Sequence, residues 1–325
     1  MHKYEMNRDF TCLRDPENGG VLTMDGGSLK SEIGHRYPII RGIPRFVDAE
    51  NYSDDFGAQW NMFPKTQLDS FTGTSISESR LARCLRGNLA NLKDKKVLEA
   101  GSGAGRFTEV LLKYGAIVNS FDFSSAVDAN AINNGDHANL VLVQADIRKI
   151  PFPKASYDYV ICLGVLQHTP NPEESIKSLW EMVKPGGALV VDHYEWQWRT
   201  FLPFGGTRAP FSRQLILRLP KKSRFKFVKA LTDFWFPLQW KYKDSSLIRR
   251  LLIKISPVAF HYPYTKLRDR QMYYEWALLD THDATTDFYQ HLRTLPQIKK
   301  YLETLGATDI VAERGGNGVE AFCRK

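Results

Sequence analysis

Cysteine and long apolar runs are scarce in this chain. Its four cysteines, Cys12, Cys84, Cys162 and Cys323, are scattered over 325 residues, and no two of them form a Cys-x-x-Cys pair. This usage argues against a disulfide framework and against a zinc site, and it is typical of a reducing compartment. No stretch approaches the ~18 apolar residues of a membrane-spanning helix, and the first ten residues lack the apolar run of a secretory signal. We therefore expect a soluble cytoplasmic protein.

Acidic residues are scarce in one part of the chain. From Arg199 to Arg270 there are 17 Lys or Arg residues and three acids, so this segment alone carries +14, while the whole chain carries +8. Any surface that attracts anions is therefore expected here. The segment is also rich in aromatic residues. Its alternative partners are an acidic substrate such as a sugar nucleotide or phosphorylated lipid, an anionic membrane surface and RNA. In the fourth interpretation, its aromatic residues form the segment's own core and its Lys and Arg residues are merely solvated.

A glycine is missing where a dinucleotide-binding turn would have its third one. The stretch KVLEAGSGAGRFTEVLL, from Lys96 to Leu112, predicts a buried strand, a glycine-rich turn and the start of a helix. Its glycines allow a sharp turn and a close approach to a ligand, while the helix presents its free N–H groups to the same place. The pattern G-x-G-x-x-G would need glycine where Arg106 stands, so an NAD-linked dehydrogenase is disfavoured.

Further landmarks follow the turn in order. Asp122 ends a second apolar strand about 20 residues on, the distance at which an acid takes ribose hydroxyls. A third strand is expected at Leu140–Gln144, and Asp146 follows it in QADIRKIPFP. A fourth strand precedes LGVLQHTPNPEE, and MVKPGGALVV predicts a helix end, a turn and a fifth strand. Together with E-x-G-x-G-x-G, the segment from Val97 to His193 resembles the class I S-adenosylmethionine (SAM) dependent methyltransferases, in particular the group that contains the ubiquinone-pathway enzymes.

The resemblance implies an α/β fold with a Rossmann-like seven-stranded sheet. We expect a small N-terminal extension at 1–50, similar to a degenerate zinc ribbon that keeps only Cys12, and a SAM-binding core with an N-terminal cap at 51–195. A basic, aromatic-rich and mainly helical lid insertion follows at 196–289, and a helix and closing hairpin at 290–325 complete the core. Gln59 and Trp60 are candidates for the cap, and Pro220, Pro237 and Pro257 are expected to break the helices of the insertion.

The resemblance also implies residues that hold SAM. Asp122 would accept from the ribose hydroxyls, Phe123 would lie against the adenine ring, and Asp146 would take the adenine amino group. The complete predicted set is Glu99, Gly101, Ser102, Gly103, Asp122, Phe123, Asp146, Ile147 and Leu163. We expect no metal site, because the spacing of ligand-type residues matches no standard set.

A hydroxyl acceptor would benefit from a general base, because its own pKa lies far above neutrality. The candidates are His168 after the fourth strand, His193 at the end of the fifth, and His282 and Asp283 in the insertion. Each has a structural alternative. His168 could stabilise its loop, His193 could form a buried pair with Asp192, and Asp283 or Thr281 could cap a helix.

The sequence thus predicts a SAM-dependent methyltransferase that acts on a small-molecule, sugar or lipid-linked glycan acceptor, at a hydroxyl. Methylation of a quinone or natural product at carbon or oxygen is one alternative, and a catalytically silent SAM-binding scaffold is the other. In one interpretation of the basic insertion, it binds an acidic acceptor. In another, the basic insertion makes a peripheral contact with the inner membrane surface. Nucleic acid ranks last among the partners, and the oligomeric state is not predicted.

Overall fold

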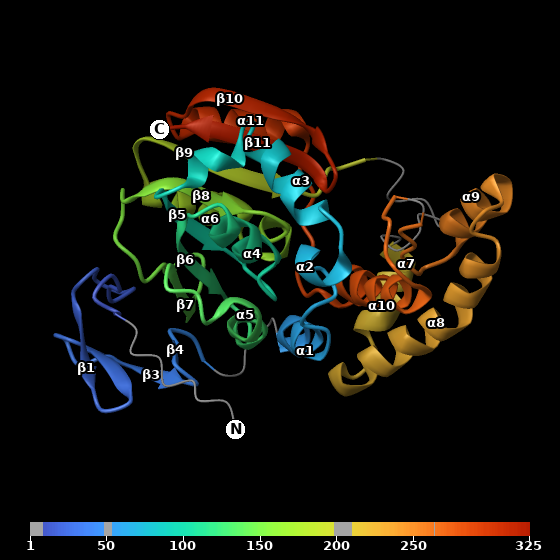
Figure 1. Ribbon diagram of the computed structural model, residues 1–325, viewed down its shortest axis with the longest axis horizontal. Coiled ribbons are helices and arrows are strands. Elements are labelled where there is room, and N and C mark those ends of the chain that lie inside the picture. The colour runs from blue at the N-terminus through green and yellow to red at the C-terminus, as the bar shows by residue number, and fades with distance from the viewer. Residues whose placement is uncertain (1–8, 49–53, 198–209, 263) are drawn as a thin grey trace. The chain divides into compact units, whose positions relative to one another are not determined.

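The computed structural model describes residues 9–48, 54–197, 210–262 and 264–325. The chain divides into two compact units. The first comprises Met1–Asn61, Glu78–Glu195 and Tyr289–Lys325, and the second comprises Met62–Ser77 and Trp196–Phe288. The start of the predicted extension and its predicted end at residue 50 lie outside the described residues. Figure 1 labels the helices and strands.

A seven-stranded sheet forms the centre of the first unit (Figure 1). Its strands, in the spatial order β10-β11-β9-β8-β5-β6-β7, are β10 (Thr308–Gly315), β11 (Gly318–Arg324), β9 (Val183–His193), β8 (Tyr157–Cys162), β5 (Lys96–Ala100), β6 (Ile117–Asp122) and β7 (Leu140–Gln144). The strands from β9 to β7 are parallel, and β11 pairs antiparallel with both β9 and β10. The predicted α/β class with a seven-stranded Rossmann-like sheet is confirmed.

The sheet is buried on both faces, and most residues of its parallel strands are accordingly apolar. Consecutive residues of β5 point to opposite sides, so Val97 and Leu98 belong to two different hydrophobic clusters. One cluster includes Ile176 of α6 (Pro172–Met182) and Leu302 of α11 (Leu295–Thr304). The other includes Leu111 of α4 (Arg106–Lys113) and parts of α3 (Ile76–Cys84), η1 (Leu89–Leu92) and α5 (Val127–Asn134).

The N-terminal extension forms its own small antiparallel sheet. Its strands are β1 (Leu22–Asp25), β2 (Ser28–Ser31), β3 (Arg36–Ile40) and β4 (Ile43–Pro44). The end of this sheet is tied to the edge strand β7, where the Phe46 amide donates to the Gln144 carbonyl at 2.8 Å. Arg45 adds hydrogen bonds to the Gln144 side chain at 3.1 Å and to Asp128 at 2.7 Å. Within the described ranges, no group of three or more His, Cys, Asp or Glu residues is placed to hold a metal ion.

The second unit is helical. It contains α2 (Asp69–Thr72), α7 (Pro210–Leu217), α8 (Lys221–Lys241), α9 (Ser246–Ile255) and α10 (Arg270–Thr286). Aromatic residues of the insertion form much of its core, in which Phe236 of α8 packs with Phe260 and Trp276. None of the helices in the described part of the chain combines the length and apolarity needed to cross a membrane.

Two local predictions in the insertion are wrong. Pro237 does not break α8, which runs through it to Lys241. Pro237 is exposed, so the carbonyl oxygen that loses its partner can meet water, while the buried Phe236 holds the helix in the core. Thr281 and Asp283 are not N-caps either, since α10 already begins at Arg270, where the Asp269 side chain caps it by accepting from the Met272 amide at 2.9 Å.

Candidate active site

The glycine turn lies between β5 and α4, and it can only be built from glycine at its key positions. Gly101 has a φ of +76°, and a Cβ atom there would lie 2.1 Å from Cγ2 of Val165. The amides of Gly101 and Ser102 both donate to the Phe121 carbonyl, at 2.7 and 3.1 Å. The turn is therefore held against the end of β6 from one side and against the loop after β8 from the other.

Asp122, at the end of β6, fixes the turn directly. Its Oδ2 accepts from the Gly103 amide at 2.8 Å, and its Oδ1 accepts from the amide and hydroxyl of Ser124 at 2.8 and 2.7 Å. A carboxylate has about four acceptor positions, so these bonds leave one on Oδ2 for a ligand. Burial raises the pKa of the Asp122 carboxyl group above its ordinary value, although part of the side chain stays exposed to solvent.

Glu99 and Ser102 carry buried oxygens that fit a ligand beside the turn. Oε2 of Glu99 accepts from Thr108 at 2.5 Å and from Ser120 at 2.8 Å, but its Oε1 is buried and has no hydrogen-bond partner among the described residues. The Ser102 hydroxyl is in the same condition in that part of the chain. Burial raises the pKa of the Glu99 carboxyl to about 7. Unsatisfied buried oxygens next to a glycine turn are what the amine and hydroxyl groups of SAM would satisfy.

The other predicted cofactor residues lie on the loops that follow β6, β7 and β8. Phe123 is half-buried after β6, Ile147 is buried after β7, and Leu163 is buried after β8. Asp146 is already engaged, because its carboxylate accepts from the Arg148 guanidinium, with Nη2 at 2.6 Å. A bond from Asp146 to an adenine amino group would therefore have to share the carboxylate with Arg148.

The predicted cap residue Trp60 lies at the turn. It belongs to α1 (Asp54–Met62), and a Cβ atom built on Gly103 would lie 3.4 Å from its indole ring. The same helix contacts the start of α5, where Asn61 Nδ2 donates to the Ser125 carbonyl at 3.0 Å. Within the first unit, α1 thus brings an aromatic side chain to the residue that Asp122 holds.

Asp192 is a structural anchor at the end of β9. Its Oδ1 accepts from the Gly164 amide at 2.6 Å, while its Oδ2 pairs with Arg80 of α3 and accepts from Asn317 at 3.4 Å. The side chain has no solvent exposure. Its oxygens accept from donors of three separate segments, so Asp192 holds these segments together at the end of β9.

His193, the next residue, has the opposite character. Its Nδ1 lies 3.0 Å from the Tyr194 carbonyl oxygen, which can only accept, so Nδ1 carries the proton and Nε2 is the basic nitrogen. Nε2 is buried and has no hydrogen-bond partner in the described part of the chain. Burial lowers the pKa of His193 to about 4, and the nearby positive charge of Arg293 acts in the same direction. The imidazole is therefore neutral at physiological pH.

The loop after β8 holds more polar groups than the sequence indicated. His168 lies edge-on to the Tyr194 ring, with centroids 5.4 Å apart, and its Nδ1 is 3.4 Å from the Tyr289 carbonyl. Gln167 is fully buried, and neither its amide oxygen nor its nitrogen has a partner among the residues described. The backbone carbonyl oxygen of Gln167 accepts a hydrogen bond from the His291 amide at 2.9 Å. Sequence reasoning missed Gln167, although it directly precedes the predicted site residue His168.

His282 and Asp283 belong to the second unit. His282 is buried on α10, where its ring lies 5.6 Å from that of Phe225 and its Nδ1 lies 3.4 Å from the Thr286 hydroxyl oxygen. Burial lowers the pKa of His282 to about 4, and Arg224 contributes to this shift. Asp283 is half-buried on the same helix. Their predicted catalytic role stays a prediction.

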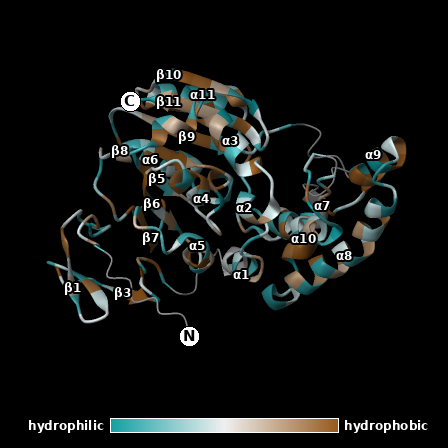
Figure 2. Cartoon of the chain, viewed as in Figure 1, coloured by the Kyte–Doolittle hydropathy of each residue, from teal (hydrophilic) through white to brown (hydrophobic). Residues whose placement is uncertain are grey.

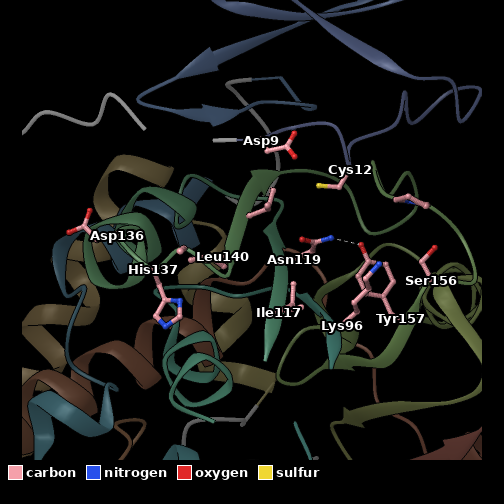
Figure 3. Close-up of a pocket in the computed structure, with 13 residues that line it drawn as sticks. Asp9, Cys12, Lys96, Ile117, Asn119, Asp136, His137, Leu140, Ser156 and Tyr157 are labelled. Atoms are coloured by element: carbon pink, nitrogen blue, oxygen red, sulfur yellow. Dashed lines mark hydrogen bonds between the residues drawn. The ribbon is translucent and has the colours of Figure 1, made fainter. Parts of the chain in front are cut away.

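A cavity of 690 Å³ lies at the amino ends of the parallel strands, at the opposite end of the sheet from the glycine turn (Figure 3). Lys96, Ile117, Leu140 and Tyr157, which begin β5 to β8, line it. Ligands of open parallel sheets bind at the carboxyl ends of the strands. The geometry therefore places the candidate active site at the glycine turn and not in this cavity.

Comparison with known families covers the part of the chain that contains the glycine turn. The model of the family described as "Methyltransferase domain" matches residues 98–191, which run from β5 to β9. This chain contains a methyltransferase domain. The strand order and the glycine turn make it a class I domain of the SAM-dependent type, as the sequence predicts.

Curated relatives match over the same part of the chain. The ubiquinone biosynthesis O-methyltransferase of Coxiella burnetii is 32% identical over 113 residues, which cover 34% of this chain and 48% of that protein. The enzyme of the same name from Pseudomonas fluorescens is 35% identical over 103 residues, covering 30% and 44%. The chain thus matches about half the length of these relatives.

One solved structure illustrates how far the likeness extends. Phosphoethanolamine N-methyltransferase 2 of Haemonchus contortus, in complex with S-adenosyl-L-methionine, aligns over 86% of this chain and 47% of its own, at 15% identity and a TM-score of 0.44. A score this low supports no conclusion about this chain.

Replacing Glu99 of the methyltransferase domain with Gln should change how stability depends on pH. The pKa of Glu99 is about 7 in the folded chain, against an ordinary value of 4.5. Between these values the unfolded chain binds fewer protons, so this group lowers the free energy of unfolding by about 3 kcal/mol as pH rises from 4.5 to 7. Glu99→Gln should lack this loss. Urea unfolding at pH 5 and pH 8 measures it, and an equal pH effect in both proteins would contradict the assignment.

Replacing Arg80 with Met should strongly destabilise the first unit, because the carboxylate of Asp192 would stay buried without its charge partner. We expect a loss of about 3 to 5 kcal/mol in unfolding free energy. The matched control is Arg86→Met, which removes an ion pair with Glu313 in which both side chains are exposed, and which should cost less than about 1 kcal/mol. Similar losses in the two variants would show that Asp192 does not depend on Arg80.

Proposed function

We propose that this chain transfers the methyl group of SAM to a hydroxyl oxygen of a small-molecule acceptor. The observation that carries the proposal is that buried polar atoms without hydrogen-bond partners among the described residues lie at two places near the carboxyl ends of the parallel strands. At the glycine turn, Glu99 Oε1 and the Ser102 hydroxyl are buried without hydrogen-bond partners in the described part of the chain, and at the end of β9 the basic nitrogen of the neutral His193 is in the same condition.

The cofactor site consists of this chain's own donors and acceptors. Asp122 would accept from a ribose hydroxyl with its remaining Oδ2 position, and Glu99 Oε1 and the Ser102 hydroxyl would meet the polar end of the ligand. The indole of Trp60 would cover the turn and exclude water from it. When bound, SAM supplies a methyl group on a positively charged sulfur, which makes the methyl carbon electrophilic.

His193 would act as the general base. Its Nε2 would accept the hydroxyl proton of the acceptor while the oxygen lone pair forms the bond to the methyl carbon and the carbon–sulfur bond breaks. Because Nδ1 donates to the Tyr194 carbonyl, the ring is held in the tautomer that this step needs. The Gln167 amide, which is buried and unpartnered among the described residues, would orient the same hydroxyl.

The names of the relatives favour oxygen as the acceptor atom, since both are O-methyltransferases of ubiquinone biosynthesis. We therefore add phenols to the candidate acceptors. The sequence itself ranks sugar and lipid-linked glycan acceptors first. A transfer assay with methyl-labelled SAM, run against diphenols and against sugar nucleotides, separates the two classes. The role of residues 196–289 as a lid stays a prediction.

Replacing Asp122 with Ala should weaken SAM binding by about 1 to 3 kcal/mol, because a ribose hydroxyl loses its acceptor and the Gly103 amide loses its partner. Isothermal titration with SAM and S-adenosylhomocysteine measures this, with NADH as the negative ligand. The control is Asp136→Ala, which should bind both ligands normally. Asp136 is exposed and lines the cavity at the amino ends of the parallel strands. Unchanged affinity in Asp122→Ala would refute the site. If the unaltered protein bound neither sulfur ligand, the proposed transfer of a methyl group from SAM would be refuted.

Replacing His193 with Gln should lower kcat about 100-fold and leave the SAM dissociation constant unchanged, because only the proton acceptor is lost. The acceptor identified in the transfer assay serves as substrate, and His137→Gln, an exposed histidine, is the matched control. In the unaltered protein, activity should persist down to about pH 5 and fall as His193 is protonated near pH 4. An acid limb near pH 6.5, or full activity in His193→Gln, would place the base elsewhere.

A further inference from the structure

Helix α9 exposes an apolar face that the second unit does not cover. Four of its aliphatic side chains are exposed: Leu247 by 78%, Ile248 by 39%, Leu251 by 57% and Ile255 by 41%. With 3.6 residues per turn, these positions lie within an arc of about 100° on one side of the helix. The opposite side carries Ile253, which is half-buried and packs against the core cluster of Phe236 and Trp276, so α9 packs on its unit through a different face.

Basic side chains flank the exposed arc. Arg250 and Lys254, one turn apart, are both exposed and lie next to the row of Leu247 and Leu251 on the helical projection. Arg249 points to the packed side, where its guanidinium donates to the Lys243 carbonyl. Figure 2 shows the resulting mixture of strongly apolar and strongly polar residues along α9.

The neighbouring surface has the same charge. On α8, Lys241 is exposed at the end that leads into α9, whereas Lys221 and Lys222 lie at the opposite end of this 21-residue helix. The described segment from 210 to 270 contains no Glu, and its acids are Asp233, Asp244 and Asp269. A surface that is apolar at its centre and cationic at its margin matches the chemistry of an anionic bilayer, in which lipid tails lie beneath negative head groups.

We propose that α9 is an interfacial membrane anchor that lays Leu247, Ile248, Leu251 and Ile255 into the surface of an anionic lipid bilayer, with Arg250 and Lys254 at the head groups. A second copy of the chain or another protein would cover the same apolar arc without needing the cations at its edge. The charge complementarity therefore decides for the membrane. The proposal is independent of the methyl transfer proposed above.

The test is sedimentation of the full chain with vesicles of phosphatidylcholine alone and with phosphatidylglycerol added. The unaltered protein should sediment only with the anionic vesicles. Leu247→Ser/Leu251→Ser and Arg250→Glu/Lys254→Glu should each bind about tenfold more weakly or worse. The matched controls are Met24→Ser/Ile33→Ser, two exposed apolar residues of the first unit, and Lys221→Glu/Lys222→Glu, with the same change of charge.

All four variants change exposed side chains, so thermal unfolding should show equal stability in each. Binding to the anionic vesicles that both controls retain and both α9 variants lose would support the anchor. Failure of the unaltered protein to bind these vesicles would overturn it. Equal losses in Lys221→Glu/Lys222→Glu and Arg250→Glu/Lys254→Glu would also overturn it, because net charge alone would then be responsible. A dimer that Leu247→Ser/Leu251→Ser converts to a monomer, without vesicle binding, would assign the face to a second copy.

Discussion

The buried carboxylate of Asp192 is the constraint on which the candidate site depends. A charge without solvent exposure is tolerated only when donors surround it, and here the donors are the Gly164 amide, Arg80 and Asn317. They come from the loop after β8, from α3 and from the turn between β10 and β11. One residue thus fixes three connections around the carboxyl end of β9. The same arrangement sets the direction of His193, which follows Asp192 in a strand and must therefore point to the other side.

Sequence alone could predict the parts of the molecule that local chemistry determines. A run such as Val97 to Ala100 can only be a buried strand, and the following glycines can only be a tight turn. Asp122 was placed correctly at the end of β6, because strand length and helix length fix its distance from the turn. The paired roles of Asp122 could not be predicted, since its bond to the Gly103 amide depends on where two separate segments meet in space.

What the sequence could not supply is the partner of each polar side chain. His168, His193 and His282 are equivalent as letters, but their environments differ. His193 has a defined tautomer and an unpartnered nitrogen in the described chain, whereas His282 lies on a helix against Phe225. A hydroxyl residue shortly before an acid is typical of a helix cap, which is the structural alternative that the sequence offers at Thr281. In the structure that hydroxyl bonds back to the Ala277 carbonyl inside α10 at 2.5 Å.

The same limit applies to the basic insertion, and there the structure decides between interpretations of a composition. One interpretation of the composition expects the aromatic residues to form the segment's own core, and Phe236, Phe260 and Trp276 do lie in the core of the second unit. Because these large rings fill the interior, Leu247, Ile248, Leu251 and Ile255 of α9 lie outside it. The feature that is left for a partner is therefore not the aromatic content that the sequence displays. It is a short row of Leu and Ile beside two cations, which becomes visible only when the buried side of α9 is known.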